Sequence, residues 1–472
     1  MRKNMGRVWM QHLNRGMLGR YDIPEHIPTT VTAVQFGLSA ALLGTVDRLI
    51  DAANPALGLA CVCPEAALAS AADPAALLRD QEGLFTLLVR GYRGETPVKE
   101  EVVVQSVVRV LGDGEALNAL AAEPGLSLAL LDTCDAGAEA ALRQAARLIA
   151  LRRQAGLGGL DFICLGERAD CAALARAAVA ALAPQAAANC AFYPALADSL
   201  VFRAEAGEAA RQCAEMNYAD GMLHIAEPFA RLTVQAPEAL GKRLGLADSP
   251  DIAFTADLEA ALALKRRLFD GALFAMAAPG WLLGCDTLAD CMKSERLRAF
   301  VGRCVYDELL PADASARAAA APYVIDCFER FENPLNRNGL LRCARPLLAR
   351  FTRGALPIIR DRAREDFEPP RRLAFALAAT IMLYAGARPD AAGRYEVARG
   401  SQRQVLSDDP GALRVFSAFS HDMPPETLAY AALADRELWG GADLRDIDGL
   451  EARVALDIAR IQREPDWLPE ED

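Results

Sequence analysis

The chain has 472 residues, of which 53% are hydrophobic and 24% are charged, and its formal net charge is -12. This length exceeds one ordinary hydrophobic core, so we expect two globular domains, and the composition excludes a disordered chain. The negative charge argues against a nucleic-acid-binding surface, so no nucleic acid is expected as a partner.

Targeting and metal-binding signals are weak in this sequence. Residues 1–16 are basic but lack the apolar core of a secretion signal. The longest uncharged apolar stretch, 373–387, is short for a membrane span and typical of a buried helix, so we expect a cytoplasmic protein with no membrane partner. The twelve cysteines form no Cys-x-x-Cys pair and are expected to be mostly small core residues. The four histidines are not at ligand spacing, so no metal is expected.

A strand, a glycine turn and a helix are predicted near the start of the chain. The run 29–36 is β-branched and apolar, and Gly37 and a helix-like segment follow it at once. This order is typical of the first unit of a nucleotide-binding fold. Ser39 lies where a second glycine would let a pyrophosphate approach, although its amide and hydroxyl could still donate to a phosphate. A plain strand-to-helix turn therefore remains an alternative.

The second predicted strand, 57–62, leads into Cys63 and Pro64. We identify no acid after it that would bind a ribose hydroxyl, so the sequence does not distinguish NAD from NADP. Segments 83–94 and 102–111 are predicted to pair as a β insertion.

Short apolar runs at 126–131 and 160–165 surround a helix predicted at 138–154. Strands that alternate with helices predict an α/β fold with a doubly wound, mostly parallel sheet. After the polar segment 241–256, helical periodicity dominates. We therefore predict a dinucleotide-binding domain at 1–250 and a mainly α-helical substrate and catalytic domain at 251–472.

One lysine and one acid, Lys265 and Asp270, lie at the head of the apolar stretch 258–284. A buried apolar helix accepts such groups only if solvent, a partner or a ligand compensates them, which makes this a candidate site. At about 100° per residue, the two positions are about 140° apart on an α-helix, so their contact is not guaranteed. The alternative is an exposed basic helix start at Lys265.

A second candidate is the arginine-rich block 330–364, which contains nine arginines and two acids. Guanidinium groups suit bidentate capture of a carboxylate. A solvated helix face is the alternative explanation of the same charge pattern.

The order of these segments resembles the lysine-dependent polyol and hexuronate dehydrogenases, which form the mannitol dehydrogenase family, and especially the tagaturonate reductases. Lys265 and Gly271 match the family motif, whereas Asp270 and Leu273 replace its asparagine and histidine. The resemblance implies a Rossmann-like N-terminal domain that binds NAD or NADP. It implies cofactor contacts at Gly37, Ser39, Asp47, Thr133, Gly137 and Glu227. It also implies substrate contacts at Asp198, Arg330, Asn333 and Arg350.

The resemblance further implies interconversion of a keto sugar acid or a ketose and its alcohol, with catalysis by Lys265 and Asp270. Lys265 is expected to act as general acid and base from the crevice between the sheet and the helical domain. An ionised Asp270 cannot donate a hydrogen bond to a carbonyl, and loss of one such donor typically lowers the rate about 100- to 1000-fold.

A catalytically degraded relative that acts as a ligand-binding or protein-interaction scaffold is the alternative hypothesis. An active enzyme with a shifted substrate range is a third possibility. The expected partner is a small sugar acid or polyol, and the chain is expected to be a monomer or a small homo-oligomer.

Overall fold

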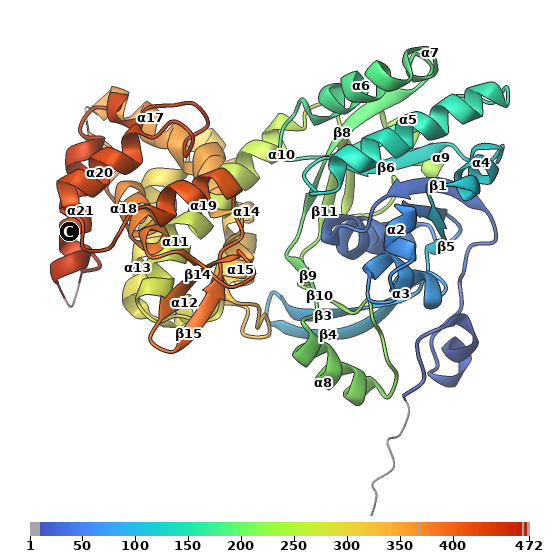
Figure 1. The fold of residues 1–472 in the computed structure, drawn as a ribbon, viewed down its shortest axis with the longest axis horizontal. Helices are drawn as coiled ribbons and strands as arrows, with labels where there is room; N and C mark the ends of the chain where they lie inside the picture. The colour runs from blue at the N-terminus through green and yellow to red at the C-terminus, as the bar shows by residue number, and fades with distance from the viewer. Residues whose placement is uncertain (1–9, 367, 465–466, 470–472) are drawn as a thin grey trace, which may run out of the picture. The chain divides into compact units, whose positions relative to one another are not determined.

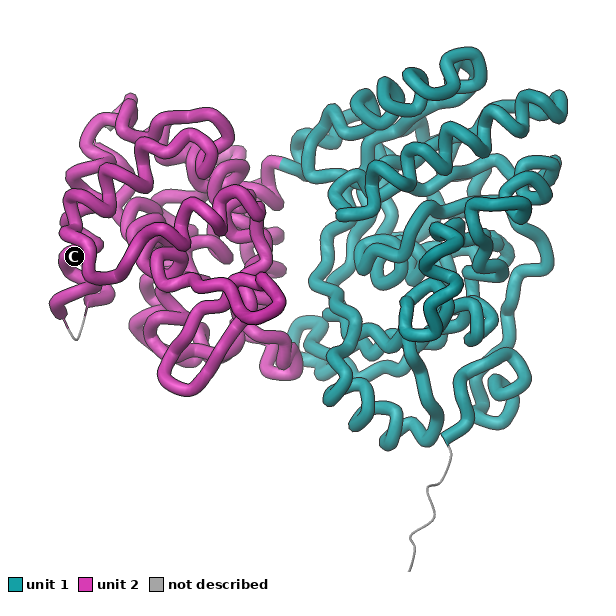
Figure 2. The backbone as a smooth tube through the Cα atoms, viewed as in Figure 1, with its two compact units in different colours: residues 1–262 teal, residues 263–472 magenta. Residues whose placement is uncertain are grey.

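The computed structural model describes residues 10–366, 368–464 and 467–469. The chain forms two compact units, Met1–Leu262 and Ala263–Asp472, which Figure 2 shows in teal and magenta. Unit 1 extends past residue 250 because strand β12 (Ile252–Thr255) still pairs with β11 (Arg231–Gln235) in its main sheet. The predicted boundary near residue 250 therefore lies before the last strand of unit 1.

Unit 1 is built on an eight-stranded sheet with the order β12-β11-β8-β7-β6-β1-β2-β5. Neighbouring strands run parallel except β8 and β11, which pair antiparallel. The other strands of this sheet are β1 (Val31–Phe36), β2 (Gly58–Cys63), β5 (Val107–Gly112), β6 (Leu128–Asp132), β7 (Asp161–Leu165) and β8 (Ala191–Asp198). This arrangement confirms the predicted Rossmann-like, mostly parallel sheet.

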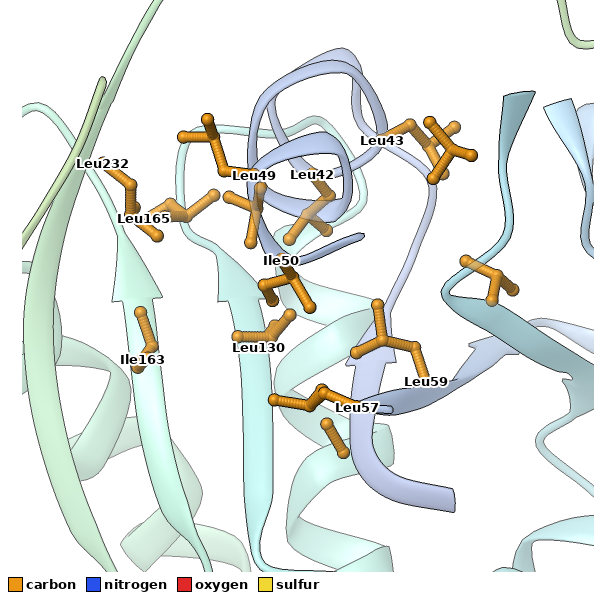
Figure 3. Close-up of a cluster of buried hydrophobic side chains, with 14 of the residues drawn as sticks. Leu42, Leu43, Leu49, Ile50, Leu57, Leu59, Leu130, Ile163, Leu165 and Leu232 are labelled. Carbon is orange, nitrogen blue, oxygen red and sulfur yellow. The ribbon is translucent and has the colours of Figure 1, made fainter. Parts of the chain in front are cut away.

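Both faces of this sheet are covered because successive strand residues point to opposite sides. In β1, Ala33 and Val34 belong to two different buried clusters. On the Val34 side lie α4 (Glu115–Ala121), α5 (Ala138–Gln154), α6 (Cys171–Leu182) and α7 (Pro184–Ala187) (Figure 1). On the Ala33 side, the π-helical segment Leu42–Asp47 and helix α1 (Arg48–Ala53) place Leu42, Leu49 and Ile50 near the sheet (Figure 3).

The predicted β insertion forms a separate four-stranded sheet with the order β4-β3-β10-β9. Its strands are β3 (Phe85–Arg93), β4 (Thr96–Val104), β9 (Val201–Arg203) and β10 (His224–Ala226). The predicted single strand 102–111 is wrong, because it joins the end of β4 to β5, which belongs to the main sheet. The chain changes sheets at Gln105 and Ser106, where the Gln105 amide donates to the carboxylate of Asp51.

Unit 2 is mainly helical, as predicted, and helices α11 (Gly271–Leu282) and α18 (Arg371–Ala385) pack together in its interior. Every α18 residue from Leu373 to Ala385 is buried. The surrounding helices include α13 (Glu295–Arg303), α14 (Ala314–Glu332), α17 (Leu356–Asp366), α20 (Pro425–Ala434) and α21 (Leu450–Arg463). A small antiparallel sheet contains β13 (Arg388–Pro389), β14 (Tyr395–Arg399) and β15 (Gln402–Val405).

All cysteines except Cys134 and Cys285 are buried, which agrees with their expected role as small core residues. Among the described residues, no helix combines the length and the apolar character that a membrane span requires. No cluster of three or more histidine, cysteine, aspartate or glutamate residues in the described part of the chain could hold a metal ion.

Candidate functional site

Lys265 and Asp270 are the first and last residues of a π-helical segment that helix α10 (Glu259–Leu264) precedes and α11 continues. A π-helix bonds residue i to residue i+5, which brings these two side chains to the same side of the helix. The Lys265 Nζ atom lies 3.3 Å from Oδ1 and 3.4 Å from Oδ2 of Asp270. The separation of about 140° expected from α-helical geometry is therefore wrong at this position.

This ion pair lies inside unit 2. The side chain of Lys265 is 8% exposed and that of Asp270 is 0% exposed. The alternative of a solvated basic helix start at Lys265 is therefore contradicted. Charged groups this deeply buried are tolerated only when they are paired and hydrogen-bonded.

Arg350 is a second cation on the same carboxylate. It ends the short helix α16 (Leu347–Arg350), and its Nη1 forms a close ion pair with Oδ1 of Asp270. Its Nε donates to the Ala344 carbonyl at 2.9 Å, and its Nη2 donates to the Arg345 carbonyl at 3.4 Å. All three nitrogens of this guanidinium thus contact unit 2, so its contacts fit a counter-ion of Asp270 rather than the expected carboxylate clamp.

Phe269 and Gly354 bring the remaining parts of this cluster together. The guanidinium carbon of Arg330, in the last turn of α14, lies 3.8 Å from the centroid of the Phe269 ring. Gly354 belongs to the π-helical segment Phe351–Ala355, and a Cβ atom there would lie 2.4 Å from the carbonyl oxygen of Arg266. The two π-helical segments therefore touch through their backbones.

Two other predicted substrate residues are buried. Asn333 directly follows α14, and its Oδ1 accepts a hydrogen bond from the Leu335 amide at 3.0 Å. Asp198 ends strand β8 in unit 1 and is 4% exposed. Leu273, at the position of the family histidine, is 0% exposed in α11.

In unit 1, the predicted cofactor residues Gly37, Ser39, Thr133 and Gly137 follow the adjacent parallel strands β1 and β6. Such loops at the carboxyl ends of neighbouring strands form the dinucleotide site of doubly wound folds. Gly37 has a φ of 89°, and a Cβ atom there would meet nothing within 4 Å. This open space above a helix start could admit a phosphate, so the turn fits a dinucleotide.

Ser39 and Thr133 have structural partners within this edge of the sheet. The Ser39 hydroxyl accepts a hydrogen bond from the Leu42 amide at 3.2 Å. It also lowers the pKa of Asp132, although burial outweighs this effect and raises that pKa overall. Thr133 donates from its hydroxyl to the Leu165 carbonyl at 2.7 Å, and the Gly137 amide donates to Asp135 at 2.8 Å.

Two of the predicted cofactor contacts, Asp47 and Glu227, have buried side chains. Asp47 is 0% exposed, and burial raises the pKa of its carboxyl well above the usual value. The side chain of Asp47 therefore packs in the interior of unit 1. Glu227 is 4% exposed, and its Oε1 accepts a hydrogen bond from the Leu200 amide at 2.5 Å. The carbonyl of Glu227 accepts a hydrogen bond from Arg48 at 3.1 Å.

Glu65 is a candidate that the sequence reasoning missed. It lies two residues beyond the end of β2 and is exposed. Its Oε1 accepts a hydrogen bond from the Gly114 amide at 3.2 Å, and a Cβ atom on Gly112 would lie 2.1 Å from that oxygen. An acid at the end of the second strand is the expected partner of an adenosine ribose. Glu65 was not identified from the sequence because Pro64 separates it from the apolar run of the strand.

Residues 257–462 match the mannitol dehydrogenase C-terminal domain. The chain is 25% identical to the altronate oxidoreductase of Bacillus subtilis (strain 168), over 96% of both chains. It is 27% identical to that of Klebsiella pneumoniae (strain 342), over 96% of this chain and 97% of the relative.

Solved structures show the same fold. The mannitol 2-dehydrogenase of Pseudomonas fluorescens, in a ternary complex with NAD and D-mannitol, has a TM-score of 0.73 and 16% identity, over 96% of this chain and 97% of that chain. A substrate-free D-sorbitol dehydrogenase has a TM-score of 0.68 and 16% identity, over 97% of this chain and 100% of that chain.

Proposed function

We propose that this chain is an NAD(P)-dependent oxidoreductase of the mannitol dehydrogenase type, which interconverts a keto sugar acid or a ketose and the corresponding alcohol. The observation that carries this proposal is the buried amine of Lys265, held by a carboxylate at the head of an apolar helix. The similarity to altronate oxidoreductases over most of the chain supports a sugar acid as substrate.

Lys265 acts as general acid and base in this proposal. In reduction, its ammonium donates a proton to the carbonyl oxygen of the substrate, and in oxidation the neutral amine accepts the proton of the hydroxyl. The bound nicotinamide cofactor supplies or accepts the hydride. Lys265 and Arg350 both pair with Asp270. The positive charge of the Lys265 ammonium stabilises an oxygen that becomes negative in the transition state.

The cofactor proposal rests on the loops of unit 1. Gly37, Ser39 and the loop from Thr133 to Gly137 would hold the pyrophosphate part of a nicotinamide dinucleotide. The exposed carboxylate of Glu65 would accept hydrogen bonds from the adenosine ribose hydroxyls and would repel a 2′-phosphate. We therefore infer that the protein uses NAD in preference to NADP.

Purified protein mixed with NADH or NADPH and a panel of tagaturonate, fructuronate and fructose tests the proposal directly. We expect the absorbance of reduced cofactor to fall with at least one keto substrate, and faster with NADH than with NADPH. Glu65→Ser should reduce the difference between the turnover rates with NADH and with NADPH. A folded protein that turns over none of the panel with either cofactor would contradict the proposed activity.

The scaffold alternative is favoured by Leu273, whose buried aliphatic side chain cannot serve as a hydrogen-bond donor. Calorimetry with NADH separates it from the enzyme. A catalyst should bind the cofactor and turn over substrate, whereas a protein-interaction scaffold should bind no cofactor. Cofactor binding without turnover on the full panel would indicate a degraded relative that retains ligand binding.

A further inference from the structure

Two cations share one fully buried carboxylate in unit 2. Oδ1 of Asp270 accepts from both Lys265 and Arg350, and Oδ2 lies 3.4 Å from the Lys265 amine. The side chains of Lys265 and Arg350 are 8% and 10% exposed, so water screens these charges poorly. Each charge in this group therefore depends strongly on the other two.

The backbone around the group fixes its geometry. The carbonyls of Ala344 and Arg345 hold the Arg350 guanidinium, and the contact between Gly354 and the Arg266 carbonyl sets the distance between the two π-helical segments. The ring of Phe269 also lies 5.8 Å from the guanidinium carbon of Arg350. Arg350 and Asp270 thus have little freedom to separate and serve other ligands.

We propose that Asp270 and Arg350 are a coupled pair of positioning residues that hold Lys265 as an ammonium aimed for proton transfer. Asp270 fixes the Lys265 amine through both of its oxygens, and Arg350 fixes Asp270 through an ion pair with Oδ1. This inference rests on the proposed function of Lys265. It assigns Arg350 to Asp270 instead of to a substrate carboxylate, and it makes an acid at position 270 a requirement of this chain.

A neutral amide at position 270 would remove the negative charge that Lys265 and Arg350 share. The degraded-relative hypothesis predicts the opposite, because Asp270→Asn restores the asparagine of the family motif and should raise activity. The positioning proposal therefore predicts that Asp270→Asn lowers activity, whereas the degraded-relative hypothesis predicts that it raises activity.

Kinetics of Asp270→Asn, Arg350→Gln and the double variant test the coupling. Each single change should lower kcat for reduction about 100-fold. If the two residues act as a pair, kcat of the double variant should be about 10-fold or more above the value expected from multiplying the two single losses. Asp270→Asn should shift the alkaline limb of the kcat profile to lower pH, and Arg350→Gln should shift it to higher pH. Arg350→Lys, which retains the charge, should restore part of the lost rate.

Matched controls are Asp422→Asn and Arg403→Gln, which change exposed residues of unit 2 and should leave kcat and its pH profile unchanged. A rise in kcat for Asp270→Asn, single effects that simply multiply, or a pH profile that neither substitution moves would overturn the inference.

A measurement that needs no turnover separates this inference from the proposed function. The chain has five lysines, Lys3, Lys99, Lys242, Lys265 and Lys293. With lysine labelled by carbon-13 at Cε, NMR should resolve them, and Lys265→Met assigns the relevant signal. In the full-length protein, the titration midpoint of Lys265 should fall by about one pH unit or more in Asp270→Asn and rise in Arg350→Gln. If the variants fold and the Lys265 midpoint does not move, the proposed roles of Asp270 and Arg350 are wrong, even if the wild type is an active reductase.

If the midpoint moves as expected but the wild type reduces no substrate, the roles of Asp270 and Arg350 are supported and only the proposed activity is contradicted.

Discussion

Two regions of the molecule place the same residue type in the same backbone setting and give it different partners. Asp47 ends the π-helical segment Leu42–Asp47 in unit 1, and Asp270 ends Lys265–Asp270 in unit 2. Both side chains are 0% exposed. Among the described residues, neither carboxyl oxygen of Asp47 has a hydrogen-bond partner of normal geometry, whereas Asp270 contacts two cations.

The pKa of Asp47 shows what burial does without a cation. Burial raises that pKa well above its usual value, and the lowering by nearby Gln35 is smaller. The neutral acid is therefore favoured at Asp47, as in an ordinary packed core. A π-helical segment that ends in a buried aspartate is thus not sufficient for a site, and the cations contributed by Lys265 and Arg350 make the difference.

The largest expected effect on stability is that of Asp270→Asn. The substitution removes the negative charge that two buried cations share, which should lower the free energy of unfolding by about 3 to 5 kcal/mol. Denaturation in urea can be followed by the fluorescence of Trp281, Trp439 and Trp467, which all lie in unit 2. Asp422→Asn should stay within about 0.5 kcal/mol of the wild type. An equally small change for Asp270→Asn would show that the ion pairs contribute no net stability.

His224 gives a second, pH-dependent effect in unit 1. Its pKa is lowered to about 4, mainly by burial, while its Nδ1 lies 2.6 Å from the Met222 carbonyl. Above pH 6.5, both the folded and the unfolded states hold neutral histidine. As pH falls from 6.5 to 4, the unfolded state gains a proton first, so the wild type should lose about 3 kcal/mol over this range. His224→Asn should remove this part of the acid sensitivity, as measured by chemical denaturation at pH 7 and pH 5. An unchanged difference between these two pH values would contradict the assignment.

Gly354→Ala should disturb the contact between the two π-helical segments. The new Cβ would lie 2.4 Å from the Arg266 carbonyl oxygen, so the backbone must shift, with a loss of about 1 to 3 kcal/mol. Turnover should also fall, because the Lys265 segment moves with Arg266. Gly302→Ala is the control, since a Cβ there meets nothing within 4 Å in helix α13 and should stabilise the helix by up to about 1 kcal/mol. Equal stability of the two variants would exclude a close backbone contact at Gly354.

Asp47→Asn should have the smallest effect. Because the folded pKa of Asp47 is raised, the wild type gains most stability from this group below pH 3.8 and loses it as pH rises through the folded pKa. An amide resembles the neutral acid, so the free energy of unfolding of the variant should lie within about 1 kcal/mol of the wild-type value at pH 7. At higher pH the variant should become more stable relative to the wild type. Thermal unfolding across this pH range measures the difference. A loss as large as that of Asp270→Asn would contradict a neutral Asp47.

The sequence predicted the sheet of unit 1 and the helical unit 2 because hydrophobic periodicity records which face of each element is buried. It also identified Lys265 and Asp270 as neighbours in one apolar segment. It did not predict their contact, because periodicity was interpreted with α-helical geometry and the segment is π-helical. The side-chain partners of Arg350 depend on contacts across 80 residues, which no local pattern records.

Three differences between the sequence analysis and the structure have simple physical causes. Glu65 was missed as a candidate because it follows Pro64, outside the apolar run that marked the strand. The strand predicted at 102–111 spans two strands because its apolar character continues through Gln105 and Ser106, which are themselves buried. Asp47 was assigned to the cofactor by its motif, whereas packing places it in the core.

The most direct test of the central claim compares Lys265→Met with Lys242→Met in reduction of a keto sugar acid by NADH. Lys242 is an exposed lysine of unit 1, with a side chain that is 68% exposed. If Lys265 is the proton donor, its loss should lower kcat by about 100- to 10,000-fold while NADH binding persists, and Lys242→Met should match the wild type. Turnover by Lys265→Met at the wild-type rate would contradict the assignment of Lys265 as the general acid and base.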